Sequence, residues 1–75
     1  MEEIKNILLD INPDLDVTRT DLVDGRYLDS LSIISLVAQL EEEFDIIIPA
    51  VEIVPKNFNS VEALHAMVER LVEED

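Results

Sequence analysis

The chain has 75 residues, contains no cysteine, and carries 18 Asp and Glu against 5 Lys and Arg, which gives a formal net charge of −13 at pH 7. Its length predicts a single domain over residues 1–75, which is too small to form a deep catalytic cleft. Disulfides and thiolate metal sites are excluded, and the longest apolar run is far shorter than the roughly 20 residues of a membrane span. We therefore expect a cytoplasmic monomer that inserts into no membrane.

The strongly acidic balance restricts the possible partners. It repels nucleic acid and anionic lipid, so we expect no nucleic-acid partner and instead proteins with basic patches. The same charge opposes a compact state, because two carboxylates about 7 Å apart in water repel each other by roughly 0.6 kcal/mol before screening. The sequence therefore predicts marginal stability at low ionic strength.

The first predicted helix is marked by four apolar residues spaced i, i+3, i+4 and i+7, namely Ile4, Ile7, Leu8 and Ile11. It ends before the Asn-Pro pair at 12–13, because a residue that precedes proline is driven out of the helical region. Residues 12–28 contain proline, glycine and scattered Asp and Thr, which indicates a long loop anchored on the core by Leu15, Val17 and Leu22. A loop of this length in a small domain is usually functional.

The second predicted helix covers residues 30–44. Asp29 is a good N-cap, because its carboxylate can accept the free amide hydrogens of the following turn, and no helix breaker follows within this range. Residues 45–51 are expected to be extended or loop-like. Residues 51–54 are compatible with a short helical turn before Pro55.

A last helix is predicted to begin near Asn59, which forms a capping-box pattern with Glu62. Its inward face is expected to consist of Val61, Leu64, Val68, Leu71 and Val72. Together these elements predict an all-α fold, a small four-helix bundle with three longer helices and one short helix.

The second helix holds more apolar residues than one core face needs. One stripe with helical spacing consists of Ile33, Leu36, Val37, Leu40 and Phe44. A second line, spaced i, i+3 and i+7, consists of Leu31, Ile34 and Ala38. Two interpretations are open: the helix is buried on two sides, or the second line is an exposed apolar strip that partner proteins grip.

Ser30 stands at the start of the second helix, and its hydroxyl has no activating partner in the sequence. A hydrolase nucleophile is commonly flanked by glycine, but no glycine flanks Ser30. The only histidine, His65, lies far along the chain. His65 falls at the edge of the last helix's apolar face and is assigned no role. A calcium loop starting at Asp14 is also excluded, because its twelfth position, normally Glu, is Gly25. We interpret Ser30 as a residue to which a group is attached.

The run Leu-Asp-Ser-Leu at 28–31, followed by Leu-Val-Ala-Gln-Leu-Glu-Glu-Glu-Phe-Asp-Ile at 36–46 and Ile-Pro at 48–49, resembles the acyl carrier proteins. The likeness continues through residues 55–61 to the last helix. It implies a bundle of the acyl-carrier type in which Ser30 receives 4'-phosphopantetheine from coenzyme A. It further implies an arm that ends in a thiol and holds an acyl or aminoacyl cargo as a thioester, while the protein itself catalyses nothing and has no metal centre.

The resemblance implies a phosphopantetheinyl transferase as one partner, and adenylating or acyl-transferring enzymes with basic docking patches as others. In the family, the aspartate before the serine helps to hold a divalent cation for the transferase, a role that would fall to Asp29. The residues expected to meet these partners are Asp29, Leu31, Ile34, Ala38, Glu41 and Glu42.

The chain departs from the commonest carriers of fatty acid biosynthesis, which tend to have Gly-Ala before Asp-Ser-Leu and acidic residues after it. Here Tyr27 and Leu28 precede the motif, and Ser32 and Ser35 stand where acids are usual. The lead-in at residues 25–28 and the segment at residues 55–58 look more like those of freestanding carriers that serve adenylating enzymes, including aminoacyl and D-alanyl carriers and those of polyketide or nonribosomal peptide biosynthesis. The remaining alternative is an acidic helical adaptor that binds a basic partner without a prosthetic group.

Overall fold

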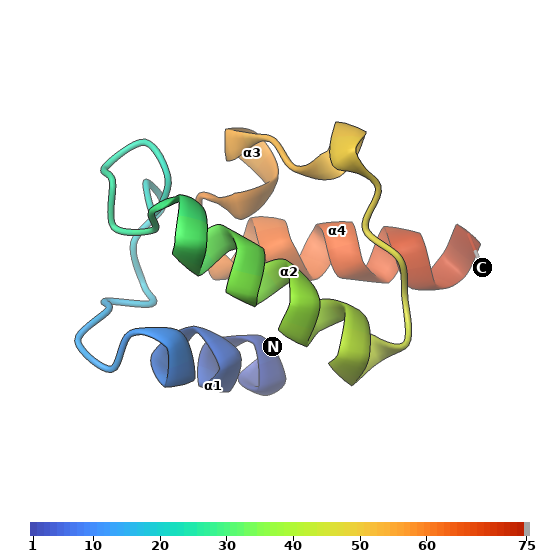
Figure 1. The fold of residues 1–75 in the computed structure, drawn as a ribbon, viewed down its shortest axis with the longest axis horizontal. Coiled ribbons are helices and arrows are strands. Elements are labelled where there is room, and N and C mark those ends of the chain that lie inside the picture. The colour runs from blue at the N-terminus through green and yellow to red at the C-terminus, as the bar shows by residue number, and fades with distance from the viewer. Residues whose placement is uncertain (75) are drawn as a thin grey trace.

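The computed structural model describes residues 1–74, which fold into helices joined by loops. Figure 1 shows the order: α1 (Glu2–Ile11), α2 (Ser30–Phe44), the 3-10 helix η1 (Ala50–Glu52), α3 (Pro55–Phe58) and α4 (Val61–Glu74). In this view α2 crosses diagonally between α1 and α4. No strand occurs within residues 1–74, and the predicted all-α bundle is confirmed. No helix in this part of the chain combines the length and the apolar character that a membrane crossing requires.

The core is formed by the inward faces of the helices together with side chains from the long loop. Its most deeply buried helical side chains are Ile4, Leu8, Leu36, Leu40, Phe58, Val61, Leu64 and Met67. The loop adds Leu15, Leu22 and Leu28, all buried, and Val17 packs against this core while partly exposed. Full burial of one such side chain stabilises the fold by roughly 1.5–3 kcal/mol. The loop is therefore attached to the bundle by the side chains that the sequence predicted as its anchors.

The bounds of the first two helices follow from their local sequence. Helix α1 ends at Ile11 because Asn12 is extended, with φ −144° and ψ 100°, and its N–H makes the last helical bond to Leu8 O. Helix α2 covers the predicted range. It ends where Asp45 adopts the left-handed conformation (φ 53°, ψ 51°) and donates its N–H to Glu41 O.

The helical turn predicted before Pro55 is present as the 3-10 helix η1, at residues 50–52 instead of 51–54. The sequence did not predict α3, a short α-helix that begins at Pro55 itself. Proline is favoured at the first position of a helix, because its missing N–H would have no helical partner there. Val54, which precedes it, is extended with φ −130° and ψ 153°, as a residue before proline should be.

Two expectations about α4 are wrong. The capping box between Asn59 and Glu62 does not form, because Ser60 caps the helix: its Oγ accepts the N–H of Ala63 at 3.0 Å. Val72 does not face the core but is 46% exposed, since the last turn of α4 extends past the ends of α1 and α2 (Figure 1). The inward face is completed by Met67, which is buried.

An ion pair attaches the segment before α3 to α4. Arg70 donates two hydrogen bonds to Glu52, Nη1 to Oε2 at 2.8 Å and Nη2 to Oε1 at 2.7 Å. The side-chain amide of Asn57 donates to the backbone carbonyl of Glu52 at 2.8 Å and to its Oε1 at 3.1 Å. Three elements, η1, α3 and α4, are thereby joined at one carboxylate.

Candidate functional site

Ser30 is the first residue of α2 and is exposed to solvent. No side-chain hydrogen bond within residues 1–74 engages its hydroxyl. The first amide groups of a helix have no partner in the helical ladder, so the backbone around Ser30 presents N–H groups and the positive end of the helix dipole. The position offers an accessible hydroxyl in surroundings that favour an anionic substituent.

Asp29 fixes the start of the helix, as the sequence predicted. Its backbone is extended (φ −91°, ψ −179°), and its Oδ1 accepts the N–H of Ser32 at 2.8 Å. Its carbonyl oxygen accepts the N–H of Ile33 at 2.9 Å. The hydrogen bond from the Ser32 amide lowers the pKa of the Asp29 carboxyl below its ordinary value. Asp29 is consequently ionised at neutral pH and stands beside the Ser30 hydroxyl.

The chain reaches Ser30 through a tight turn. The carbonyl oxygen of Leu22 accepts the N–H groups of both Tyr27 and Leu28 at 2.9 Å, and the side chains of Leu22 and Leu28 are buried. Gly25 is required in this turn, because a Cβ there would lie 2.6 Å from a ring carbon of Tyr27 and 2.8 Å from the carbonyl oxygen of Asp21. Ser30 is therefore two residues from a buried anchor.

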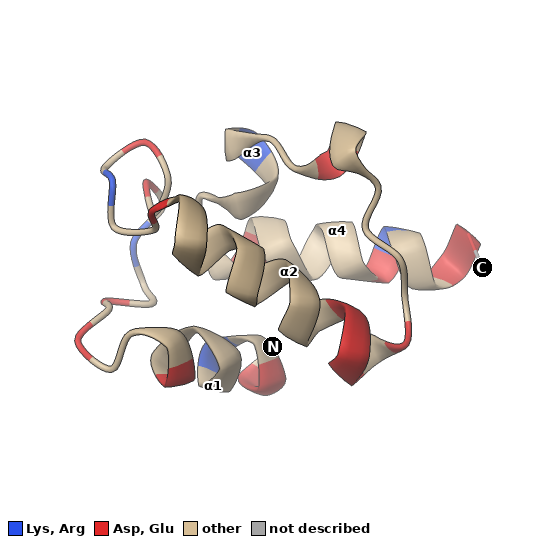
Figure 2. Ribbon diagram, in the orientation of Figure 1, with Lys and Arg blue, Asp and Glu red and all other residues tan. Residues whose placement is uncertain are grey.

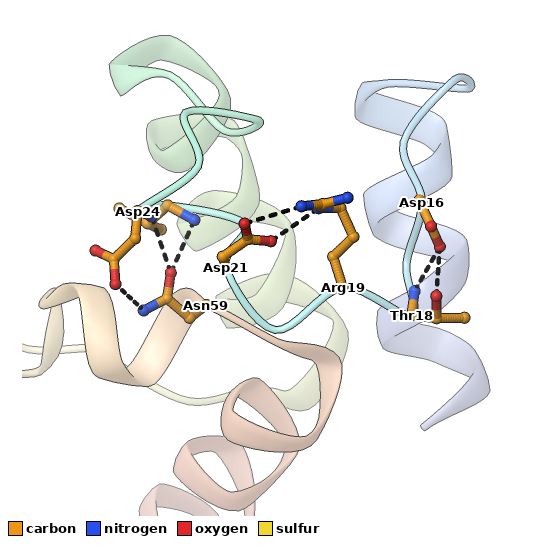
Figure 3. Close-up of polar contacts among 7 residues, drawn as sticks. Asp16, Thr18, Arg19, Asp21, Asp24 and Asn59 are labelled. Carbon is orange, nitrogen blue, oxygen red and sulfur yellow. Dashed lines mark hydrogen bonds and ion pairs between the residues drawn. The ribbon is translucent and has the colours of Figure 1, made fainter.

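The outer side of the loop carries a charged cluster (Figure 3). Arg19 donates two hydrogen bonds to the carboxylate of Asp21, at 2.8 and 2.9 Å, and its guanidinium lies 4.3 Å from the centre of the Tyr27 ring. The hydrogen bond from Arg19 lowers the pKa of Asp21. The pair neutralises one loop carboxylate and packs against the ring of Tyr27, three residues before Ser30 in the chain.

The second apolar line of α2 is an exposed strip. Leu31 is 75% exposed, Ile34 is 65% exposed, and Ala38 is also exposed, whereas Leu36 and Leu40 are buried on the opposite side of the helix. Of the two interpretations that the sequence left open, burial on two sides is wrong. Figure 2 shows that the helix is uncharged from its start to residue 40, with its acidic residues gathered at the C-terminal end.

The two acidic candidates for docking differ in their contacts. Glu42 is exposed, whereas Glu41 is partly buried and its Oε2 accepts the N–H of Ile48 at 2.8 Å. Both lie near the far end of α2, about 17–18 Å along the helix axis from Ser30 at 1.5 Å per residue. The structure thus brings Asp29, Ser30 and Leu31 together and leaves the acidic pair at a distance.

Sequence reasoning missed the two most exposed apolar side chains of the α2–α3 connection. Ile47 is 82% exposed and Val51 is 80% exposed, while Ile46 and Ile48 are buried. The alternation is that of an extended chain with one buried side, a period-two signal that three consecutive isoleucines conceal. It also missed Asn59, whose side chain contacts the loop before Ser30 (Figure 3).

A small apolar hollow of about 160 Å³ lies beside the first turns of α2, lined by Val23, Ile33, Ile53, Val54, Pro55 and Phe58. Ligand pockets that enclose a drug-sized molecule measure roughly 300–1,000 Å³. This hollow is below that range, so in this structure it has no room to enclose a long acyl chain.

A four-helix domain that presents an exposed serine hydroxyl at a helix start, with no acidic side chain in the first helical turn, is the arrangement expected of a prosthetic-group carrier. The family model described as the phosphopantetheine attachment site matches residues 2–68. The chain belongs to this family, and its prosthetic group is 4'-phosphopantetheine. The exposed Ser30 hydroxyl and the absence of any acidic side chain from the first turn of α2 fit such a group.

Two relatives carry the name of aminoacyl carrier proteins, both from Bradyrhizobium diazoefficiens. The chain is 48% identical to aminoacyl carrier protein 1 over 54 residues, which cover 71% of this chain and 59% of the relative. It is 44% identical to aminoacyl carrier protein 2 over 41 residues, which cover 55% of this chain and 46% of the relative. The matches thus span about half the length of these relatives. No solved structure gave a significant match.

Proposed function

We propose that Ser30 carries the 4'-phosphopantetheine group and that the protein presents an acyl or aminoacyl cargo to partner enzymes without catalysing a reaction itself. The observation that carries this proposal is the exposed Ser30 hydroxyl at the capped start of α2, inside the region that the family model matches. The adaptor alternative has no observation in its favour.

The charges around Ser30 act in opposite directions on a phosphodiester. The N-terminus of α2 favours an anion by about 0.3–1 kcal/mol. The ionised Asp29 repels it, and a divalent cation held by Asp29 during transfer would offset this repulsion. When bound, the group supplies a thiol that can form a thioester, and this chain has no thiol of its own.

The proposed partners are a phosphopantetheinyl transferase and enzymes that load or accept the cargo. Asp29 and the exposed strip of Leu31, Ile34 and Ala38 would form the contact near the attachment residue. Acidic side chains at the far end of α2 would meet basic patches on the partner. Glu42 is the first candidate, and Glu41 could still accept hydrogen bonds besides the one from Ile48. The names of the two relatives make an aminoacyl group the first cargo to test.

The proposal is tested by mass spectrometry of the purified protein after incubation with coenzyme A, magnesium and a broad-specificity phosphopantetheinyl transferase. We expect the wild type to gain one phosphopantetheinyl mass and Ser30→Ala to gain none. Ser35→Ala is the matched control, because Ser35 is another exposed serine of the same helix, and it should be modified like the wild type. No gain in the wild type would favour the adaptor.

A further inference from the structure

We infer that Asn59 is a positioning residue for the modification of Ser30, because it holds the loop that leads into α2. This inference rests on the proposed attachment at Ser30. Asn59 lies at the junction of α3 and α4, far from the attachment residue in sequence, and it neither caps α4 nor contacts Ser30. Its role is argued from the hydrogen bonds that it makes.

Asn59 binds three consecutive residues of the loop with both its backbone and its side chain, and Figure 3 shows the side-chain contacts. Its carbonyl oxygen accepts the N–H of Leu22 at 2.9 Å. Its Oδ1 accepts the N–H groups of Val23 and Asp24, each at 3.0 Å. Its Nδ2 donates to Asp24 Oδ2 at 3.0 Å. One side chain therefore satisfies two loop amides and one loop carboxylate.

The fixed segment connects directly to the attachment residue. Leu22, bound by the Asn59 backbone, accepts the N–H groups of Tyr27 and Leu28 and closes the turn between them. Leu28 is buried, and the next two residues are Asp29 and Ser30. Contacts at the α3–α4 junction thus determine where the chain enters α2, through a loop that has no regular secondary structure to hold it.

The chemistry of this contact is specific for asparagine. It needs an acceptor that serves two N–H groups and, on the same short side chain, a donor that reaches a carboxylate. Aspartate keeps the acceptor but opposes the Asp24 carboxylate with a second negative charge. Alanine removes both functions and leaves the amides of Val23 and Asp24 without their side-chain acceptor.

Without the side-chain contacts of Asn59, the loop would hold Ser30 in the position that the transferase binds for a smaller fraction of the time. An apparent affinity falls in proportion to that fraction, whereas the chemical step within the bound complex is unchanged. The signature of positioning is therefore a raised KM of the transferase for the carrier with kcat preserved. Loss of stability alone, at a temperature where the variant remains folded, does not raise KM.

The test measures transferase kinetics with coenzyme A as donor and the cofactor-free protein as acceptor, at a temperature well below each variant's melting temperature. We expect Asn59→Asp to raise KM about tenfold with kcat changed less than about twofold. The double variant Asp24→Asn/Asn59→Asp should restore KM to within about twofold of the wild type, because the amide introduced at position 24 can donate to the carboxylate introduced at position 59.

Two controls separate positioning from charge and from stability. Asp14→Asn/Asn59→Asp has the same net charge as the rescued variant, but the exposed Asp14 does not contact position 59, so KM should stay raised. Ser60→Ala removes the neighbouring cap of α4 without touching the loop contacts, so it should lower the melting temperature and leave KM unchanged.

Amide hydrogen exchange gives a readout that does not depend on the transferase. The N–H groups of Tyr27 and Leu28 should exchange faster in Asn59→Asp and return to wild-type rates in Asp24→Asn/Asn59→Asp. Unchanged KM or unchanged exchange in Asn59→Asp, equal rescue by Asp14→Asn, or a raised KM in Ser60→Ala would each overturn the inference while leaving the attachment at Ser30 intact. A wild type that is never modified would overturn both.

Discussion

The side-chain Oε2 of Glu41 accepts the backbone N–H of Ile48 at 2.8 Å, across the end of α2. This bond ties the extended segment after the helix back onto its last turn. The two buried side chains of that segment, Ile46 and Ile48, are thereby held against the core while Ile47 points outward. One carboxylate of the acidic helix end therefore has a structural function, and its neighbour Glu42 is free of such a contact within residues 1–74.

The two glutamates should consequently differ when each is changed to alanine. Glu41→Ala leaves the Ile48 amide without its acceptor and should destabilise the fold by about 1 kcal/mol. For a domain of this size that corresponds to a fall in melting temperature of about 4–8 °C. Glu42→Ala should leave the melting temperature unchanged or slightly raised, because it removes only a repelling charge. Thermal unfolding followed by circular dichroism measures both.

The same pair tests ionic docking. Glu42→Ala should raise the transferase KM at low salt, and the difference from the wild type should disappear at high salt, where exposed charges are screened. A melting temperature of Glu41→Ala equal to that of the wild type would show that the bond to Ile48 contributes nothing. An identical KM for Glu42→Ala at low salt would remove this residue from the docking surface.

The N-cap at Asp29 should make part of the stability depend on pH. Its pKa is lowered in the folded protein, chiefly by the Ser32 amide, from an unfolded value of about 3.9. A lowered pKa contributes stability that is fully present above the unfolded pKa and is lost as the pH falls through the folded pKa. The melting temperature of Asp29→Ala should therefore lie below that of the wild type at pH 7, with a difference that shrinks below about pH 4.

Asp14→Ala is the control for this experiment, because it removes another exposed carboxylate, one that caps no helix. Its melting temperature should not fall at pH 7. A difference between wild type and Asp29→Ala that stays constant down to pH 2.5 would mean that the charge of Asp29 has no part in the cap.

Substitutions in the exposed strip on α2 should change binding to the transferase without changing the stability of the fold. Leu31→Ala removes a side chain that is 75% exposed, so the melting temperature should barely change while the transferase KM rises. Leu36→Ala, five residues further along the helix and fully buried, should instead destabilise the fold by about 2–5 kcal/mol. Leu9→Ala, which truncates a leucine of α1 that is 37% exposed, is the control for binding and should leave KM unchanged. An unchanged KM for Leu31→Ala would exclude the strip from the contact.

The features that could be predicted from the sequence are those decided within a few residues. Asp29 caps the helix that follows it, and the Asn-Pro pair at 12–13 terminates α1, because both effects act over one turn. The spacing of Leu36 and Leu40 identified the buried side of α2 for the same reason. The place of Ser30 at the exposed start of α2 could be predicted because the residues that set it are its neighbours in sequence, while its role as the attachment residue stays a prediction.

The features that escaped prediction depend on contacts between distant segments. Asn59 and Ser60 are both good N-cap residues, and only the loop 35 residues away decides that the first binds Asp24 while the second caps α4. Likewise, the apolar character of Leu31 is equally compatible with burial and exposure until the place of α2 between its neighbours is known. Pro55 was taken as a stop, although a proline serves a helix start equally well.

The net charge of −13 should make stability depend on ionic strength. The ion pairs within residues 1–74 engage only a minority of the carboxylates, among them Asp21 with Arg19 and Glu52 with Arg70. Screening weakens the repulsion among the remaining acids, since the Debye length falls from about 30 Å at 0.01 M salt to about 10 Å at 0.1 M. The melting temperature should therefore rise between these two sodium chloride concentrations.

Magnesium chloride at matched ionic strength should raise the melting temperature equally if screening alone acts, and further if the ion binds specific carboxylates. A melting temperature that is the same at both salt concentrations would show that charge repulsion does not limit the stability of this fold.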